Sequence, residues 1–337
     1  METGHVENTD TPLVFSLPGV NFRHFAGESD FPGMVAILAA RFQAEKDERL
    51  STLEDIRNQF ANLANCDPAR DYLFAESDGK MVGYASVTWE LEEDTQDRVF
   101  FLTVNVFPDW EDKGLDGILL DWACAHAREI IAESPRPEQD KMDFFTMLSD
   151  QHQVALLELT GFSPVRYFFR MRRDLDTLPN DPLPKGIELL PITPRDYRAL
   201  WDASVEAFKD EWGAVVPRES WYEEWLGHRY FQPLIWQIAW HQGKIVGMVL
   251  NYVDQLENEA YNRSRGYTES ICVLREWRGK GVASALICRS LQMLKAMNMT
   301  EAALTVDTEN PSGARGLYER LGFQPYRTLA AYRKILA

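Results

Sequence analysis

In the second half of the chain, short apolar runs alternate with a longer segment in which apolar residues recur at helical spacing. Residues 271–273 form a short apolar run that predicts a strand, and residues 302–306 form another. Between them, apolar side chains recur at helical spacing from 282 to 297, which predicts a helix. A turn with two glycines, residues 278–281, joins the first strand to this helix. The pattern predicts strand, turn, helix and strand, followed by a helix led by Asn310 and a last strand.

A similar order of patterns occurs in the first half of the chain. Three of its segments recur later at shifts of 164, 167 and 161, because residues 78–83, 106–110 and 156–162 correspond to 242–247, 273–277 and 317–323. The changing shift is typical of diverged copies of one unit. We therefore expect an α/β protein with two domains, at 14–174 and 187–337, joined by a proline-containing linker over 175–186.

Composition excludes several classes of partner. The 337 residues carry a formal net charge of −17, and proteins that bind nucleic acid usually present a basic face. The six histidines have no paired spacing, so no metal site is predicted, and Cys124, Cys272 and Cys288 are expected to be buried thiols. No apolar run approaches about 18 residues and the polar start is no signal peptide, so we expect a cytoplasmic protein without membrane association. The sequence does not indicate an oligomeric state.

The glycine-containing turn has the features of a diphosphate site. A turn between a strand and a helix leaves backbone N–H groups free at the helix start, where the helix dipole also favours negative charge. Gly279 and Gly281 allow the backbone to approach a ligand, Ala283 is small, and Arg278 and Lys280 add positive charge. The alternative is an ordinary loop before a helix with two solvated cations.

Two motifs together carry a resemblance to a known superfamily. They are Val273-x-Arg275-x-Trp277-Arg278-Gly279-x-Gly281-x-Ala283, and Asn310-Pro311 followed by Tyr318 and Gly322-Phe323. In this order the sequence resembles the GNAT superfamily of acyl-CoA N-acyltransferases over residues 187–337. The tandem layout is similar to that of the mycothiol synthase family. One departure is Arg275, where the superfamily often has proline.

The resemblance implies the fold and the cofactor. Each half should contain a mixed, mostly antiparallel central sheet with a parallel, splayed strand pair, flanked by helices. The co-substrate would be acetyl-CoA, with no metal, and the pantetheine would pair with the strand before the turn. The residues implied in cofactor binding are Val273, Leu274, Arg275, Arg278, Gly279, Lys280, Gly281, Val282, Ala283, Ser284, Asn310 and Arg315.

The resemblance also implies two catalytic residues. Tyr318 occupies the position of the general acid that protonates the leaving thiolate, although it could instead be a tyrosine packed on the sheet. Glu269 is the candidate general base. In several family members the carboxylate stands two positions earlier, where this chain has Tyr267. Because positions 269, 271 and 273 alternate along a strand, we expect Glu269 to share a face with Val273.

The first half has different residues at the corresponding positions. Glu111, Asp112 and Asp116 replace Arg278, Gly279 and Ala283, Leu157 replaces Tyr318, and Ser149 replaces Asn310. Three carboxylates around a diphosphate would repel it, and leucine cannot donate a proton. We therefore expect the first half to keep the scaffold with a degenerate cofactor site.

The predicted function is acetyl-CoA-dependent N-acetylation of a primary amine by direct attack in a ternary complex, with a small-molecule amine as acceptor. Residues 201–225 and a hairpin over 252–261 would form an acidic and aromatic rim that suits a cationic acceptor. Three alternatives stay open: acetylation of protein N-termini or lysines, a CoA-responsive binding or sensor protein without turnover, and an interaction scaffold that binds no CoA. No residue identifies the acceptor or the preferred length of the acyl chain.

Overall fold

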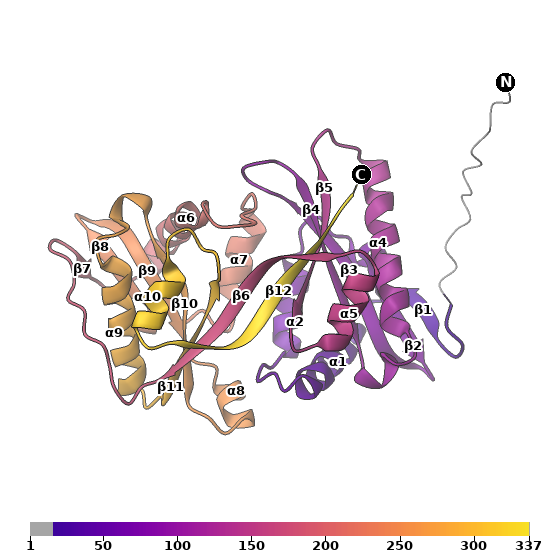
Figure 1. Ribbon diagram of the computed structural model, residues 1–337, viewed down its shortest axis with the longest axis horizontal. Helices are drawn as coiled ribbons and strands as arrows, with labels where there is room; N and C mark the ends of the chain where they lie inside the picture. Colours follow the sequence, from indigo (N-terminus) through magenta and orange to yellow (C-terminus); the bar gives the residue numbers. More distant parts are fainter. Residues whose placement is uncertain (1–15, 337) are drawn as a thin grey trace.

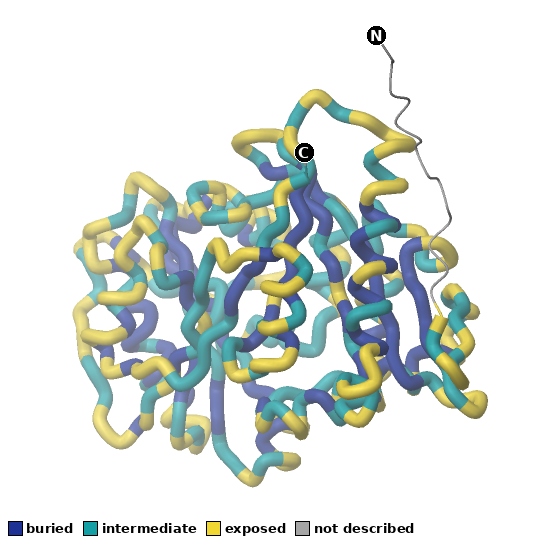
Figure 2. The backbone as a smooth tube through the Cα atoms, turned by 45° about the vertical axis from the view of Figure 1, so that its right-hand side comes forward, coloured by how far each residue is buried: buried dark blue, intermediate teal, exposed yellow. Residues whose placement is uncertain are grey.

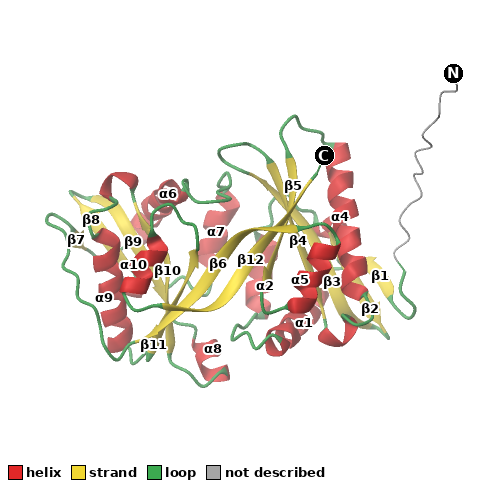
Figure 3. Cartoon of the chain, in the orientation of Figure 1, coloured by secondary structure: helices red, strands yellow, loops and turns green. Residues whose placement is uncertain are grey.

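The computed structural model describes residues 16–336, which form one twelve-stranded sheet with helices on both faces (Figures 1 and 3). The strands, in chain order, are β1 (Asn21–His24), β2 (Tyr72–Ser77), β3 (Lys80–Leu91), β4 (Arg98–Val106), β5 (Asp140–Met147), β6 (Ser163–Asp174), β7 (Glu188–Leu189), β8 (Gln237–His241), β9 (Lys244–Tyr252), β10 (Arg265–Val273), β11 (Glu301–Asp307) and β12 (Gln324–Ile335). The α-helices are α1 (Phe31–Ala44), α2 (Leu53–Ala61), α3 (Pro68–Asp71), α4 (Leu115–Glu133), α5 (Gln151–Leu159), α6 (Tyr197–Phe208), α7 (Glu219–Gly227), α8 (Gln255–Ala260), α9 (Val282–Ala296) and α10 (Ala314–Arg320). Five short 3₁₀ turns, η1 (Glu28–Asp30), η2 (Pro108–Trp110), η3 (Pro194–Asp196), η4 (Pro233–Ile235) and η5 (Arg275–Trp277), complete the order.

Each half of the chain contributes the same succession of strands. β2 and β3 form one predicted hairpin and β8 and β9 the other, and all neighbours are antiparallel except two pairs, β4 with β5 and β10 with β11. The parallel strands β10 and β11 pair only over residues 265–267 with 301–303, so beyond Tyr267 they separate. The predicted fold, a mixed and mostly antiparallel sheet with splayed parallel pairs, is confirmed.

The last strand of each half completes the sheet of the other half. The strand order is β1-β2-β3-β4-β5-β12-β6-β11-β10-β9-β8-β7, so β12 lies beside β5 and β6 lies beside β11. Figure 1 shows the two long strands crossing the centre of the molecule side by side. Residues 175–186, the predicted linker, contain no helix or strand. The two halves therefore share one continuous sheet, whereas the sequence predicted two consecutive domains.

Apolar helix faces cover the sheet on both sides, and the buried segments of Figure 2 follow the strands. In the second half, Leu286, Ile287 and Leu291 of α9 are fully buried against one face. On the other face, Leu200 of α6 packs with Met248 and Cys272. The predicted burial of Cys124, Cys272 and Cys288 is confirmed.

Two local predictions were wrong. Residues 252–261 do not form a simple hairpin, because Asp254 caps the short helix α8 by accepting a hydrogen bond from the Glu257 N–H at 3.1 Å. Asn310 does not begin α10, because that helix starts after Gly313. The Asn310 side chain accepts from the Ser312 N–H at 2.9 Å instead, which closes a turn ahead of the helix. Within residues 16–336, the helices are too short or too polar to cross a bilayer.

Candidate active site

A cavity of about 530 Å³, here called the splay cavity, opens where β10 and β11 separate. Its walls come from the end of β10, the turn before α9, the segment between β11 and α10, α10 itself and the loop after α6. Of the predicted site residues, it brings together nine: Val273, Arg278, Gly279, Gly281, Val282, Ala283, Ser284, Asn310 and Tyr318. Leu274, Arg275, Lys280, Arg315 and Glu269 lie outside its lining.

The turn before α9 fits a diphosphate. Gly279 and Gly281 have φ values of +71° and +82°, in the left-handed region that side chains disfavour. Gly281 is the N-cap residue of α9, and no side chain caps this helix. A Cβ added at Gly281 would meet no atom within 4 Å, so the turn borders open space. Uncapped N–H groups with a positive dipole end and room beside them can bind an anion.

The cations predicted beside the turn are engaged elsewhere. The Arg278 guanidinium donates to Asp210 Oδ2 at 2.7 Å and to the carbonyls of Ala207 and Val273 at 2.8 and 3.1 Å. Arg275 is exposed and also pairs with Asp210, whose carboxyl pKa the two arginines lower. The Lys280 ammonium lies 4.6 Å from the centre of the Trp277 ring. In this conformation Arg278 is held by protein partners, whereas Lys280 has no carboxylate partner among the residues described, so a role of these two charges in binding a diphosphate stays a prediction.

The backbone of Val273 faces the gap between the parallel strands. Leu274 N–H donates to Val246 of β9 at 3.0 Å, and peptide groups alternate in direction along a strand. Val273 therefore directs its N–H and C=O toward β11, which has already separated from β10. On this side a ligand could pair with the Val273 N–H, because the Val273 C=O already accepts from Arg278. The Leu274 side chain packs against the apolar cluster on the α6 face instead.

Three further predicted residues have partners within the protein. The Ser284 hydroxyl bonds to Asp181 of the 175–186 segment. The Asn310 amide donates to Glu211 Oε1 at 3.1 Å. Arg315 pairs with Glu319 at 2.9 Å on α10 and lies over the Phe169 ring. Asp181, Asp210 and Glu211 thus belong to the cavity wall. Asp210 and Glu211 lie in the segment 201–225 predicted as an acidic rim, whereas no motif in the sequence marked Asp181.

Tyr318 lies on α10 with its side chain 5% exposed, and it lines the splay cavity. Burial raises the pKa of its hydroxyl above the ordinary value of 10.0, and the nearby Glu269 carboxylate raises it further. The phenol therefore remains protonated at neutral pH. Its hydroxyl makes no hydrogen bond with another residue in the described range, 16–336. A phenol whose hydroxyl is accessible from a cavity and has no protein partner can protonate a leaving group.

Glu269 lies on the opposite face of β10 from Val273, contrary to the prediction. Glu269 pairs with Leu250 of β9, and Cys272 pairs with Met248. The stretch of β10 between these two pairs is therefore one residue longer than the matching stretch of β9, and Ser270 within it has a φ of +46°. This bulge reverses the alternation of side chains. Glu269 consequently lines a second cavity of about 170 Å³, here called the inner pocket.

The environment of Glu269 suits a base. Burial raises the pKa of its carboxyl from 4.5 to about 7, although Thr305, at 3.5 Å, and the Arg170 guanidinium oppose the rise. The other carboxylates of the inner pocket, Asp47, Glu48 and Glu257, all pair with arginines. Glu269 forms no such pair with the residues described. General base catalysis is most efficient when the pKa of the base lies near the working pH.

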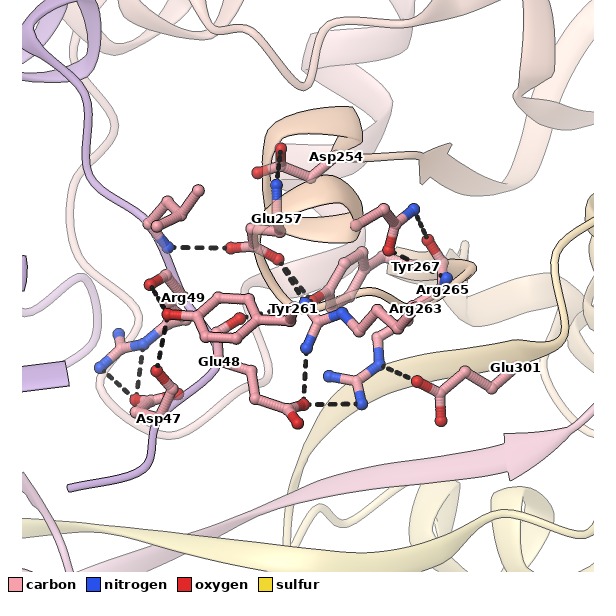
Figure 4. A network of polar contacts seen from close by, with 12 residues as sticks. Asp47, Glu48, Arg49, Asp254, Glu257, Tyr261, Arg263, Arg265, Tyr267 and Glu301 are labelled. Carbon is pink, nitrogen blue, oxygen red and sulfur yellow. Dashed lines mark hydrogen bonds and ion pairs between the residues drawn. The ribbon is translucent and has the colours of Figure 1, made fainter. Parts of the chain in front are cut away.

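The inner pocket is built by both halves of the chain (Figure 4). Glu48, in the loop after α1, pairs with Arg263 at 2.6 Å and with Arg265 at 3.0 Å. Glu257 of α8 accepts from Arg263 and from the Tyr267 hydroxyl, each at 2.8 Å. Tyr267 stands where several family members are expected to have the carboxylate, and here its hydroxyl donates to Glu257, a carboxylate from another element. Because Glu257 is committed to these donors, it is a poorer base than Glu269.

The predicted acceptor rim is only partly present. Tyr252 and Glu257 line the inner pocket. The aromatic residues of α6 and α7 pack against each other instead, with Trp225 stacked on Trp236 at 5.5 Å and tilted against Trp201 at 5.7 Å. Among residues 16–336 no group of His, Cys, Asp and Glu side chains could hold a metal ion.

In the first half, internal ion pairs hold the corresponding turn. Arg41 of α1 lies 3.4 Å from Glu111 and 2.9 Å from Asp150. His152 Nε2 lies 2.6 Å from Asp116, which is 2% exposed. Leu157, which replaces Tyr318, is fully buried in the apolar core. Arg41 and His152 are thus committed to carboxylates of the protein, and Leu157 offers no proton donor at the position that corresponds to Tyr318.

Comparisons with known proteins agree with this geometry. Residues 32–140 and 197–323 both match the Acetyltransferase (GNAT) family. The chain is 32% identical over 180 residues to a mycothiol acetyltransferase of Thermobispora bispora, covering 52% of this chain and 59% of that protein. It is 31% identical over 103 residues to the N-alpha-acetyltransferase MAK3 of Arabidopsis thaliana, covering 31% and 52%. The matched region covers less than two thirds of the length of each of these two relatives.

Solved structures extend the similarity over both halves. A GCN5-related N-acetyltransferase from Sphaerobacter thermophilus superposes with a TM-score of 0.68 at 25% identity, covering 95% of this chain and 97% of that one. A tandem GNAT protein from the clavulanic acid biosynthesis pathway has the same fold, with a TM-score of 0.62 at 17% identity over 94% and 98%. The family match covers more than half of the chain. The chain therefore belongs to the GNAT acetyltransferase family and carries that domain twice in tandem.

Proposed function

We propose that the second half of the chain binds acetyl-CoA and transfers its acetyl group to a primary amine by direct attack. The observation that carries the proposal is the uncapped start of α9 beside the splay cavity, with Tyr318 reaching into that cavity and Glu269 lying close behind it. The first half would serve as scaffold, because ion pairs hold its own turn.

Each group has a role that its environment supports. Acetyl-CoA supplies an activated carbonyl and a thiolate leaving group. The backbone amides at the start of α9 would bind its diphosphate, and the Val273 N–H would stabilise negative charge on the carbonyl oxygen. Glu269 would take a proton from the acceptor ammonium, and the neutral amine then forms the C–N bond. As the C–S bond breaks, Tyr318 would give its proton to sulfur and the nitrogen would lose its second proton to solvent on becoming the amide. Glu269 would then release its proton to solvent and Tyr318 would regain one from it.

The acceptor is proposed to be a small-molecule amine. The inner pocket beside Glu269 measures about 170 Å³, and one carboxylate there lacks an arginine partner. Relatives named mycothiol acetyltransferase also support a small acceptor. A second candidate is a protein N-terminus, which the relatives named N-alpha-acetyltransferase favour.

A panel of amines tests the proposal. The purified protein is incubated with acetyl-CoA and each amine or peptide, and both the released thiol and the acetylated product are measured. We expect turnover on at least one amine. Tyr318→Phe should lower kcat about 100-fold while the Kd for acetyl-CoA changes by less than about twofold. Binding of acetyl-CoA without turnover on any acceptor would contradict the enzyme and favour a sensor.

A further inference from the structure

A larger and more open cavity, here called the outer groove, adjoins the inner pocket. It measures about 780 Å³, and Glu48 and Tyr326 line both cavities. Its walls are β6 and β12, which run together between the halves (Figure 1), and the segment after α1. The outer groove therefore extends from the inner pocket toward the first half of the protein.

The carboxylates of the outer groove are already paired. Glu48 is held by Arg263 and Arg265 at 2.6 and 3.0 Å. Glu45 lies 3.3 Å from Arg41 in the first half. Their negative charge is thus compensated within the protein, so the remaining charges determine which ligand group the groove attracts.

Those remaining charges are positive. Lys46, Arg172 and Arg327 line the outer groove. Arg327 donates to the backbone carbonyls of Glu45 and Lys46 and to no carboxylate in the described range. Arg172 is exposed, lies 5.1 Å from the centre of the Tyr326 ring, and makes no ion pair with residues 16–336. Two guanidinium groups without carboxylate partners are unexpected at a cavity in a chain of net charge −17.

The geometry of β6 relates this charge to the catalytic carboxylate. Arg170 lines the inner pocket with Glu269, and Arg172 lines the outer groove. Residues two apart on a strand point to the same face and are separated by about 7 Å. Arg172 therefore lies beyond Arg170 on the same face of β6. An acceptor that is bound in the inner pocket and extends into the outer groove would reach its guanidinium.

We infer that the acceptor carries an anionic group several atoms away from its reactive amine, and that Arg172 and Arg327 bind this group in the outer groove. The inference rests on the proposed function and narrows its substrate class to amines with a remote carboxylate or phosphate. Both anions suit a guanidinium fork, so the shared chemistry is an oxyanion. The amine end of the same molecule would lie at Glu269.

Matched acceptors test the inference. Linear ω-amino carboxylates of increasing length are compared with their amides and with the corresponding aminoalkyl phosphates, each with saturating acetyl-CoA. We expect kcat/KM for the preferred oxyanion to exceed that of the neutral amide by about tenfold or more at the best length. The carboxylate and phosphate series decide which oxyanion the groove prefers.

Variants at Arg172 provide the second arm. Because this side chain is exposed and makes no hydrogen bond with the described residues, Arg172→Gln should fold normally. It should reduce the ratio of kcat/KM between oxyanion and amide about fivefold, and Arg172→Glu should reverse the preference. Arg195→Gln is the control, because Arg195 is 86% exposed on η3 and lies outside both cavities.

The outcomes separate the two proposals. Equal kcat/KM for oxyanion and amide at every length would overturn the inference while leaving the acetyltransferase proposal intact. Equal effects of Arg172→Glu on charged and neutral acceptors would also overturn it. Failure to acetylate any amine would instead contradict the proposed function itself.

Discussion

Replacing Glu269 with glutamine should make the protein more stable and less active at the same pH. The substitution removes a negative charge and keeps the shape of the side chain. Glu269 is half-buried in the inner pocket and has no arginine partner among the residues described. Loss of water around the carboxylate raises its pKa from 4.5 to about 7. The folded protein therefore holds a charge there at a cost that glutamine avoids.

The size of the effect depends on pH. Because the folded state keeps the Glu269 proton to a higher pH than the unfolded chain, it binds more protons between pH 4.5 and about 7. The free energy of unfolding consequently falls as pH rises through this window, by about 3 kcal/mol in all. We expect Glu269→Gln to raise it by up to about 3 kcal/mol at pH 8, and by less than about 1 kcal/mol at pH 5.

Activity should change in the opposite direction. With a pKa of about 7, the deprotonated fraction of Glu269 rises roughly tenfold between pH 6 and pH 8, and kcat/KM should rise with it. This rise forms the acidic limb of the pH profile of kcat/KM. In Glu269→Gln the acidic limb should disappear, and kcat/KM should fall about 100-fold at pH 8.

Urea unfolding at pH 5 and pH 8 measures the stability, and the pH profile of kcat/KM measures the catalysis. Glu259→Gln is a matched control, because Glu259 is an exposed glutamate on α8 and should change neither quantity. A variant that gains equal stability at both pH values would refute the account of the buried charge. A variant that keeps the acidic limb would refute the role of Glu269 as base.

Three further substitutions test the surroundings of the site. Arg170→Gln removes a cation that lowers the pKa of Glu269, so the midpoint of the acidic limb should move above about pH 7, and an unchanged midpoint would contradict this coupling. Asp210→Asn removes a negative charge from the cavity wall and leaves the positive charge of Arg278 uncompensated, so the Kd for acetyl-CoA measured by titration should fall and depend more strongly on salt, and an unchanged Kd would contradict this. Arg41→Met leaves half-buried carboxylates unpaired in the first half, so the free energy of unfolding should fall by about 1–2 kcal/mol, whereas no change in urea unfolding would show that those pairs contribute little.

Local patterns in the sequence predicted local structure well. Helix α9, strand β11 and both hairpin turns follow from the periodicity and turn residues of short segments. The repeat predicted two copies of one fold, which the structure confirms. These features depend on neighbours in the chain, so the sequence contains the information that determines them.

Features that depend on distant residues were not predictable in this way. β6 and β12 occupy equivalent positions in the two copies, so the pattern could not tell which sheet each would join. Simple alternation along β10 predicted Glu269 on the same face as Val273, but the bulge at Ser270 places the two side chains on opposite faces. The residues that pair with Arg278 and Arg265, Asp210 and Glu48, lie far away in the sequence, and no motif connects them.

The most direct measurement compares two glycine variants by titration with acetyl-CoA. Gly281 and Gly114 are the N-cap residues of α9 and α4, with φ values of +82° and +76°, and neither has an atom within 4 Å of an added Cβ. Alanine should strain both turns by a similar amount, roughly 1–2 kcal/mol. We expect the parent to bind one acetyl-CoA per chain, Gly281→Ala to weaken binding about tenfold or more, and Gly114→Ala to leave it unchanged. Two sites per chain, or loss of affinity only in Gly114→Ala, would contradict the assignment of the cofactor site to the second half.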